Sequence, residues 1–233
     1  MQFITGATGV AVDGIGNLFI AGGDQRIYRV SPKGVMTRIA GTGIYGFSGD
    51  GGSATNATIG NPYGICVNPS GNVFITDNNR IRIIDTNGII ATIAGNGSGA
   101  FSGDGGPATN AAFNSPGGIR IDTSGNWFVA DTGNNRIRKV SVAGTVTSVA
   151  GTNQQFFGTY SGDGGAATNA GLNTPFRVAT DVVGNFFIAD YGNNRIRKVN
   201  TNGVITTVAG STNVTSLGDG GPATNSVSPL QLM

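Results

Sequence analysis

Short apolar runs alternate with Gly-, Asn- and Asp-rich turns along the whole chain, and no stretch has the spacing of an amphipathic helix. Four of the runs share one form, with consecutive apolar residues directly after Gly-Asn. They are Leu18–Ile20, Val73–Ile75, Trp127–Val129 and Phe186–Ile188. Because side chains alternate between the two faces of a strand, a strand that is apolar at every position is buried on both faces. The pattern therefore predicts small sheets that stack face against face.

These runs belong to a repeat that occurs four times along the 233 residues. The units span 9–63, 64–117, 118–176 and 177–233, after a junction segment at 1–8. Each unit holds four short runs of β-type sequence separated by turn residues, and it ends in a long Gly-rich loop. Four-stranded units at this period are typical of propeller blades, which stack around a common axis. The sequence predicts an all-β fold, a β-propeller with four blades in one domain.

The two ends of the sequence bear on how the blades close into a ring. Gln2–Thr5 occupies the place before the first unit that Ala112–Ser115 holds before the third, and Val227–Leu232 occupies the matching place after the fourth. Head and tail therefore overlap at one repeat junction. Three arrangements stay open: a closed ring of four blades, part of a larger ring, or an eight-bladed ring shared by two chains.

The chain contains no His and no Glu, which narrows the chemistry that it can perform. A Ser-His-Asp triad, a Cys-His pair and a His-ligated zinc are excluded, and a catalytic carboxylic acid must be an Asp. The single Cys66 lies in an apolar run and is predicted to be a small buried side chain. The composition disfavours catalysis, and we expect neither an enzyme nor a cofactor.

Eleven Arg and three Lys stand against twelve Asp, so the formal net charge is only +2. This balance excludes a polybasic tail, and a nucleic-acid interface would need an unpaired basic stripe with stacking aromatic residues. No run approaches the roughly 18 apolar residues of a membrane span, and the N-terminus lacks the pattern of a secretion signal. We therefore expect neither nucleic-acid binding nor membrane insertion.

One end of the predicted propeller carries most of the acidic residues. In an antiparallel blade, the loop between the second and third strands and the long loop after the fourth strand emerge at the same end. Eight of the twelve Asp lie in these loops: Asp24, Asp77, Asp131, Asp190, Asp50, Asp104, Asp163 and Asp219. The opposite end carries only tight turns such as Thr123–Gly125. Because binding residues often lie on loops held by a rigid scaffold, we expect this long-loop face to bind a ligand.

The Asp of the long loops admit two interpretations. Each precedes Gly-Gly, and the four weak calcium candidates are Asp50, Asp104, Asp163 and Asp219. Calcium takes about six to eight oxygen ligands, so one carboxylate per loop favours a structural role in which Asp accepts local backbone hydrogen bonds. No metal site is favoured.

The Asp of the shorter loops each precede an Arg by a few residues. Carboxylates and guanidinium groups at a repeating spacing are expected to satisfy each other within every blade. The predicted structural ion pairs are Asp77 with Arg80, Asp131 with Arg136, and Asp190 with Arg195. Arg26 follows Asp24 in the first unit in a similar way.

Two Arg interrupt the repeat in the first strand of a unit. Arg120 replaces the Ala or Cys of the other units, and Arg177 replaces their Gly. Since the first strand is innermost, both are predicted to project toward the central channel. Pairing with a neighbouring Asp, or drift in an exposed pore, is the favoured interpretation, and binding of a carboxylate or an acidic sugar is the functional hypothesis. An insertion adds Phe156, Phe157 and Tyr160, which form either a partner-binding patch or a cover for the blade junction.

The motif Asp-x-x-Gly-Asn with its apolar triplet, followed by Gly-Asn-Asn-Arg-Ile-Arg-Lys-Val at 133–140 and again at 192–199, resembles the NHL repeat. The extension Phe-Ser-Gly-Asp-Gly-Gly-Pro-Ala-Thr-Asn at 101–110 is similar to the longer variant of bacterial secreted proteins and teneurin-like propellers. The resemblance implies an NHL-type β-propeller, although closed NHL propellers usually have six blades. Enzymatic relatives use His on zinc or a metal site with Glu, and this chain has neither residue.

The resemblance and the residues together predict a non-catalytic interaction module that is extracellular or on the cell surface. It would bind protein or glycan through the long-loop face. A structural or assembly subunit of a surface fibre or oligomeric propeller, with self-association, is the alternative. A propeller hydrolase or lyase is a further alternative, because a fold of this kind does not determine function.

Overall fold

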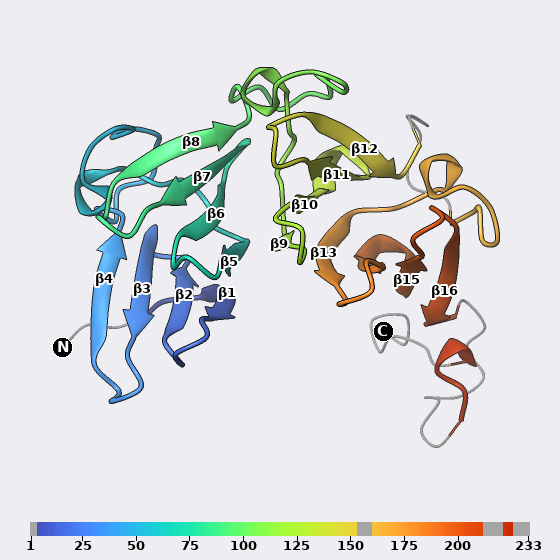
Figure 1. Cartoon of the computed structure of the whole chain (residues 1–233), viewed down its shortest axis with the longest axis horizontal. Helices are drawn as coiled ribbons and strands as arrows, with labels where there is room; N and C mark the ends of the chain where they lie inside the picture. Colours follow the sequence, from blue (N-terminus) through green and yellow to red (C-terminus); the bar gives the residue numbers. More distant parts are fainter. Residues whose placement is uncertain (1–3, 153–159, 212–220, 226–233) are drawn as a thin grey trace.

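The computed structural model describes residues 4–152, 160–211 and 221–225. Within them, sixteen strands form four antiparallel sheets of four strands, each ordered as along the chain. The sheets stand around a central axis, with the first strand of each sheet innermost and the fourth outermost (Figure 1). The all-β propeller with four blades that the sequence predicts is confirmed.

Each blade is a meander of four consecutive strands. Blade 1 consists of β1 (Ala7–Val12), β2 (Leu18–Gly22), β3 (Arg26–Val30) and β4 (Met36–Ala40). Blade 2 consists of β5 (Ile65–Val67), β6 (Val73–Asp77), β7 (Arg80–Ile84) and β8 (Ile90–Ala94). Blade 3 consists of β9 (Ile119–Ile121), β10 (Trp127–Asp131), β11 (Arg136–Val140) and β12 (Val146–Ala150). Blade 4 consists of β13 (Pro175–Thr180), β14 (Phe186–Asp190), β15 (Arg195–Val199) and β16 (Ile205–Ala209).

Short 3-10 turns lie between and within the blades. Four of them have the sequence Ala-Thr-Asn and follow the fourth strand of a blade: η1 (Ala54–Asn56), η2 (Ala108–Asn110), η4 (Ala167–Asn169) and η6 (Ala223–Asn225). Two more connect the second and third strands: η3 (Thr132–Asn134) and η5 (Tyr191–Asn193). Asn135 and Asn194 end these two connections in the left-handed conformation, each with a φ of 54°.

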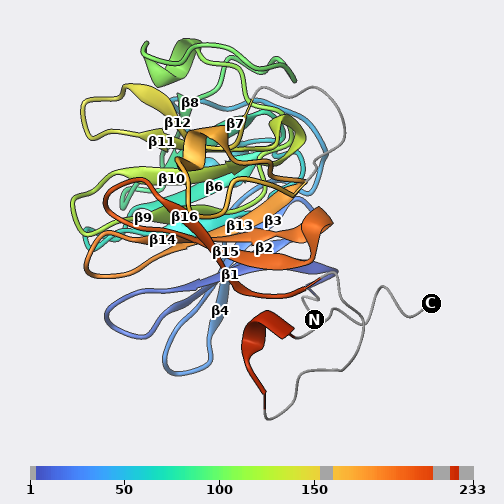
Figure 2. The ribbon, with the colours of Figure 1, turned by 90° about the vertical axis from the view of Figure 1, so that its right-hand side faces the viewer.

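Turns between the first and second strands are closed by Asp side chains in blades 1, 3 and 4 and by Asn68 in blade 2. In blade 3, Asp122 accepts hydrogen bonds from the backbone N–H of Ser124 (2.9 Å) and Asn126 (2.8 Å). Gly125 supplies the left-handed conformation of this turn, with a φ of 83°. Figure 2 views the molecule edge-on, and the hairpins of the sheets project to its left side. Hydrogen bonds to these Asp and Asn side chains and the left-handed conformation of Gly thus form the tight turns at one end of the propeller.

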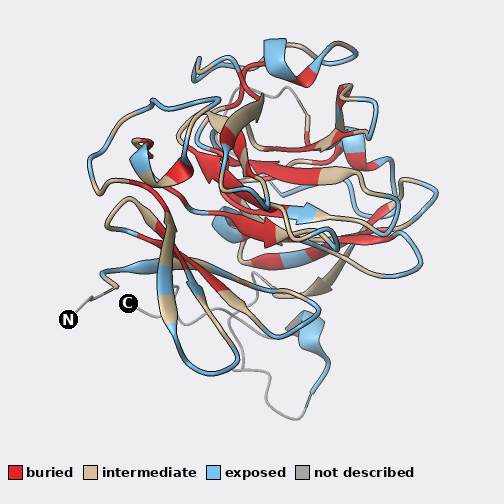
Figure 3. Ribbon diagram, turned by 60° about the vertical axis from the view of Figure 1, so that its left-hand side comes forward, coloured by how far each residue is buried: buried red, intermediate tan, exposed pale blue. Residues whose placement is uncertain are grey.

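Apolar interfaces join blade 1 to blade 2, blade 2 to blade 3, and blade 3 to blade 4. Between the first two blades, Phe19 and Ile27 pack with Ile75 and Ile90, and all four side chains are at most 5% exposed. Buried residues are concentrated in the strands, and exposed residues in the connecting turns (Figure 3). Burial of this apolar surface is the main force that stacks the blades.

The long loop of each of the first three units crosses to the following blade. The backbone N–H of Gly51 donates to the carbonyl of Ile90 (2.8 Å), and Gly105 donates to Val146 (2.8 Å) in the same way. The third unit repeats this contact with blade 4. Each of these loops therefore fastens its own blade to the next one.

The junction between blade 4 and blade 1 differs from the other three. Val10 of blade 1 is 63% exposed, whereas Ile65 at the equivalent position of blade 2 is 7% exposed. Ile196 of blade 4 is 38% exposed, whereas Ile27 at the equivalent position of blade 1 is fully buried. Among the described residues, no apolar cluster spans this junction. On the outward face of blade 1, however, Ile20 and Tyr28 are buried, so the prediction that both faces of every sheet are buried holds only in part for the two end blades.

Candidate functional site

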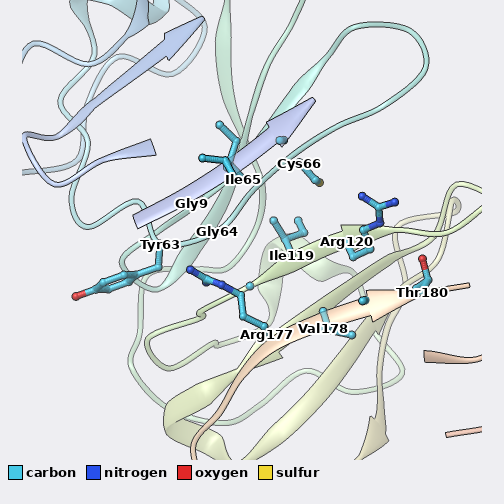
Figure 4. A pocket seen from close by; sticks show the side chains of 14 residues that line it. Gly9, Tyr63, Gly64, Ile65, Cys66, Ile119, Arg120, Arg177, Val178 and Thr180 are labelled. Atoms are coloured by element: carbon cyan, nitrogen blue, oxygen red, sulfur yellow. The ribbon is translucent and has the colours of Figure 1, made fainter. Parts of the chain in front are cut away.

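A pocket of about 260 Å³ lies on the propeller axis and is lined by the first strands of all four blades (Figure 4). Gly9, Gly64, Gly118 and Arg177 occupy the same position at the beginning of this strand in the four units. Arg120 also lines the pocket, so the structure places both irregular Arg residues at the axis, as predicted. We call this cavity the axial pocket.

Three blades need Gly at this first position because the next blade lies so close. A Cβ on Gly9 would lie 2.8 Å from the carbonyl oxygen of Tyr63, and one on Gly64 would lie 2.4 Å from that of Gly117. A Cβ on Gly118 meets the following blade in the same way. Each carbonyl belongs to the residue just before the equivalent position of the next blade. Close packing at the inner edge therefore excludes side chains at the first three of these positions.

The fourth position accepts Arg177 because no apolar interface holds blade 1 against blade 4. The guanidinium Nη2 of Arg177 donates to the carbonyl oxygen of Thr8 at 2.5 Å. Thr8 precedes Gly9, so this carbonyl is the equivalent of those that approach the Gly residues elsewhere. At the junction of blades 3 and 4, the backbone N–H of Gly118 donates to the equivalent carbonyl of Phe176 at 2.8 Å. This hydrogen bond from Arg177 thus links the inner edges of blade 4 and blade 1.

The guanidinium of Arg177 is incompletely satisfied. Its Cζ lies 4.4 Å from the centre of the Phe176 ring, which fixes the plane of the group. Nη1 is buried and has no hydrogen-bond partner in the described part of the chain. Burial lowers the pKa of Arg177, since removal from water disfavours its charged form.

Arg120 extends toward Cys66, at a different end of the axial pocket from Arg177 (Figure 4). Its side chain is exposed, and no ion pair of the described residues includes it. It also lines a second cavity of about 380 Å³ together with Asp13, Asp122 and Asp181. These carboxylates are held by their own turns, and a hydrogen bond from the side chain of Asn17 lowers the pKa of Asp13.

The axial pocket offers groups for binding and few for acid–base chemistry. None of its lining residues, all of which are described, is acidic. Cys66 is 3% exposed, and burial raises the pKa of its thiol to about 12, so it is neutral at physiological pH. The pocket therefore supplies guanidinium donors, the hydroxyl group of Thr180 and apolar walls.

The predicted pairing of loop carboxylates with Arg is correct in kind but wrong in partner. Asp77 pairs with Arg82 (3.1 Å), and no ion pair of the described residues joins it to Arg80. In the same way, Asp131 pairs with Arg138 (3.2 Å) and not with Arg136.

Blade 4 shows the same correction, because Asp190 pairs with Arg197 (3.4 Å) and not with Arg195. The reason is depth: Arg197 lies in the buried middle of its strand, whereas Arg195 begins the strand beside an aromatic ring. In blade 1, Asp24 pairs with Arg26 (3.1 Å), as the sequence predicts.

The deeper Arg residues also bind the Asp of the preceding long loop. Arg82 contacts Asp50 at 2.6 Å, Arg138 contacts Asp104 at 2.7 Å, and Arg197 contacts Asp163 at 2.7 Å. These guanidinium groups are fully buried, and each is paired with two carboxylates. These ion pairs therefore connect successive units, whereas the spacing along the sequence predicts pairs within single blades.

Arg80, Arg136 and Arg195 instead lie against aromatic rings of the preceding long loop. Their guanidinium carbons lie 3.8 Å from the ring centre of Phe47, 3.8 Å from that of Phe101 and 3.7 Å from that of Tyr160. Such cation–π contacts hold the loop on the next blade.

Tyr160 of the insertion also donates a hydrogen bond to Asp163 at 2.7 Å. It is thus part of the blade junction, one of the two roles considered for it. Phe156 and Phe157 lie outside the described residues.

The calcium candidates in the described part of the chain already form ion pairs with Arg residues. Asp50, Asp104 and Asp163 each accept from a buried Arg, and Asp219 lies outside the described residues. No group of three or more acidic or Cys side chains in the described part is arranged to hold a metal ion. The long-loop Asp therefore fasten blades together.

One signal in the sequence identifies this network. The third strands of the last three units begin Arg-Ile-Arg, whereas that of the first unit begins Arg26-Ile-Tyr28. The second Arg is present in each unit that follows the long loop of another unit. In blade 1, Tyr28 donates to Asp24 at 2.5 Å instead. The difference between the units thus marks the residue that receives the loop.

No helix among the described residues is long and apolar enough to cross a membrane. The family model of the teneurin NHL domain matches residues 44–102, 97–159 and 156–228. Teneurin-4 of Homo sapiens is 28% identical over a region covering 66% of this chain and 8% of that protein. Teneurin-1 of Mus musculus is 29% identical over a region covering 83% of this chain and 8% of that protein. The chain thus spans a small fraction of the length of these relatives.

Solved structures with the same fold align with this chain over about half of their own length. A Bacteroides thetaiotaomicron protein of unknown function has a TM-score of 0.65 at 22% identity, over 81% of this chain and 46% of that one. An auxiliary nutrient binding protein from Bacteroides ovatus has a TM-score of 0.61 at 20% identity, over 88% of this chain and 49% of that one. A streptogramin B lyase has a TM-score of 0.57 at 15% identity, over 87% of this chain and 54% of that one. These likenesses show the fold, and the family model shows that the chain belongs to the teneurin NHL domain family.

Proposed function

We propose that the chain is a non-catalytic interaction module that acts outside the cell or at its surface and binds a protein or glycan ligand. The observation that carries this proposal is the axial pocket, with apolar walls and two Arg side chains that have no ion-pair partner among the described residues. Pockets with apolar walls and a few placed polar groups are typical of binding sites. Family membership supports placement outside the cell.

The lyase and lactonase activities of other propellers are the competing assignment, because one solved neighbour is a streptogramin B lyase. Proton transfer needs a positioned group whose pKa is near the working pH. The residues lining the axial pocket include no carboxylate, and the thiol of Cys66 has a pKa of about 12. This chemistry favours binding over catalysis.

The test uses the whole chain, labelled at a surface Lys, on arrays of immobilised glycans and extracellular proteins. Saturable binding that is lost after heat denaturation is the expected result. Incubation with streptogramin B and with simple lactones should leave these compounds unchanged. Turnover of either class, or the absence of saturable binding on both arrays, would contradict the proposal.

Assembly is a second candidate, and the exposed faces of the end blades favour it. Val10 and Ile196 are exposed where the equivalent residues of other blades are buried, and the two faces are of the kinds that pack together at the other junctions. A second copy could therefore place its blade 1 on blade 4. Arg177 opposes this contact, because the equivalent position is Gly at each close junction. Dimers in mass photometry that Ile196→Asp abolishes would establish assembly, and a monomer would reject it.

A further inference from the structure

Arg177 breaks the repeat at a position where the other three units require Gly. Its side chain enters the axial space, where packing alone calls for no charged group. We propose that the axial pocket is a carboxylate-binding site for one uronic acid residue of a glycan, with Arg177 as the residue that binds the carboxylate. This inference rests on the proposed binding function and names the chemical class of its ligand.

The guanidinium charge of Arg177 at the axial pocket is unbalanced, in contrast to that of the fully buried Arg residues between the blades. Arg82, Arg138 and Arg197 are each paired with two Asp carboxylates. Arg177 makes no ion pair with a described residue, and no acidic residue lines the pocket. Removing a guanidinium from water without a counter-charge is unfavourable, so an anion that enters the pocket is stabilised there.

The geometry of Arg177 suits a carboxylate. The guanidinium group carries five N–H donors in one plane, and a carboxylate accepts two of them side by side. Nη2 has one bond to the Thr8 carbonyl, and Nη1 has no partner among the described residues. The Phe176 ring under the guanidinium limits its rotation and keeps the donors oriented. Unsatisfied donors are therefore held in a fixed plane beside the pocket, with Nη1 itself shielded from solvent.

Size and lining favour a single sugar residue over an extended polymer or a peptide side chain. A volume of about 260 Å³ lies just below the range of sites for drug-sized ligands, which is about 300–1,000 Å³. Ile65, Ile119 and Val178 supply apolar walls, and Thr180 supplies a hydroxyl group. A uronic acid combines a compact ring, hydroxyl groups and one carboxylate, whereas a lone Asp or Glu side chain leaves much of this volume empty.

Arg120 contributes charge at longer range. It lines the same pocket but points toward Cys66 and away from Arg177 (Figure 4). Asp13, Asp122 and Asp181 line the adjoining cavity with Arg120 and offset part of its attraction for an anion, and the two guanidinium groups are not placed on one carboxylate. We therefore expect Arg120→Ala to weaken binding less than Arg177→Gly does.

The experiment titrates glucuronate into the whole chain by isothermal calorimetry, with glucose as the neutral analogue and N-acetylglutamate amide as the acidic side-chain analogue. Arg177→Gly restores the residue of the other units, Arg177→Gln replaces the guanidinium with a shorter neutral amide, and Lys33→Ala removes an exposed cation outside the pocket. Circular dichroism and melting curves check that each variant is folded.

Glucuronate should bind the wild type and Lys33→Ala equally, and both Arg177 variants should lose about tenfold or more in affinity, as expected for a charge-assisted hydrogen bond. Glucose should bind much more weakly. Equal binding by the Arg177 variants, no binding of glucuronate at millimolar concentration, or a preference for N-acetylglutamate amide would overturn the proposal.

Failure of this site and failure of the proposed function give different results. If the wild type and Arg177→Gly bind the same array ligands equally well, the interaction module stands and the carboxylate site is rejected. If glucuronate binds at Arg177 but no glycan or protein on the arrays is retained, the site stands and the interaction function is rejected.

Discussion

Replacing Arg138 by Met is expected to remove the centre of one buried ion-pair network. Arg138 is fully buried and pairs with Asp131 (3.2 Å) and Asp104 (2.7 Å). It also donates to the carbonyl oxygens of Ser102 (3.0 Å) and Ala112 (3.2 Å). Met keeps an unbranched apolar side chain that replaces the Arg stem but provides no donor and no charge. The substitution leaves the Asp131 carboxylate buried without its guanidinium.

The expected loss of unfolding free energy is about 4 kcal/mol, because removing one partner of a buried ion pair costs about 3–5 kcal/mol. Asp131 has a side-chain exposure of 0%, so water does not replace the lost partner. Asp104 has a side-chain exposure of 35%, and Asp104→Asn should cost about 1 kcal/mol or less. One variant removes the buried centre of the network and the other its partly exposed end, so their difference measures the effect of burial.

Urea unfolding followed by the fluorescence of Trp127, the single Trp, measures both variants. The pH dependence supplies an independent check. Burial raises the pKa of Asp131 above its ordinary value of 3.8, and loss of Arg138 removes a group that favours the charged form. A carboxyl group with a raised folded-state pKa stabilises the fold below pH 3.8 and loses that contribution as the pH rises through its folded pKa. The deficit of Arg138→Met should therefore shrink in acid. A loss no larger than that of Asp104→Asn would refute this reasoning.

Three further predictions concern other parts of the fold. Gly64→Ala should lower the free energy of unfolding in urea by about 1–3 kcal/mol because its Cβ would overlap the next blade. Gly14→Ala, with no atom within 4 Å of the added Cβ, should leave it unchanged, and equal effects would contradict this reasoning. Cys66 should react with a thiol reagent only after denaturation, since its thiol is buried with a pKa of about 12, and rapid native labelling would argue against that burial. The hydrogen bond from Asn185 lowers the pKa of Asp181. The stabilising contribution of Asp181 is therefore present above pH 3.8 and is lost as the pH falls through its folded pKa. Melting curves of Asp181→Asn should show a weaker acid dependence than those of the wild type, and an unchanged profile would oppose this.

The blade architecture was predictable because local chemistry and the repeat agree. Consecutive apolar residues such as Val73–Ile75 require burial on both faces, and they lie in strand β6 between two blades. Asp122 and Gly125 specify a tight turn without help from distant residues. Four repetitions of the same local signals leave few alternatives to stacked sheets.

The ion-pair partners were not predictable from spacing alone. Asp77 and Arg80 are close in sequence and lie opposite each other in the ladder of β6 and β7. The ion pair forms with Arg82 because that residue also reaches Asp50, which comes from the loop of the preceding unit. Sequence spacing within one unit contains no information about a loop that arrives from another. The comparison of the Arg-Ile-Arg units with Arg26-Ile-Tyr28 does contain it.

The inner edge of the ring was only partly predictable. The replacement of Gly by Arg177 indicated an unusual channel residue, but the reason lies in the distances between blades. Gly is needed where the next blade approaches closely, and Arg177 reaches across the fourth junction to Thr8. Such a difference between otherwise similar junctions depends on the assembled ring.

The central claim, that the axial pocket is a binding site, is tested most directly by NMR of the Arg side-chain Nε–H groups during addition of glucuronate. The Arg177 signal is assigned by its absence from the spectrum of Arg177→Gly. A saturable shift of this signal, with the signal of Arg38 outside the pocket unchanged, is the predicted result. An unchanged Arg177 signal throughout the titration would contradict the claim.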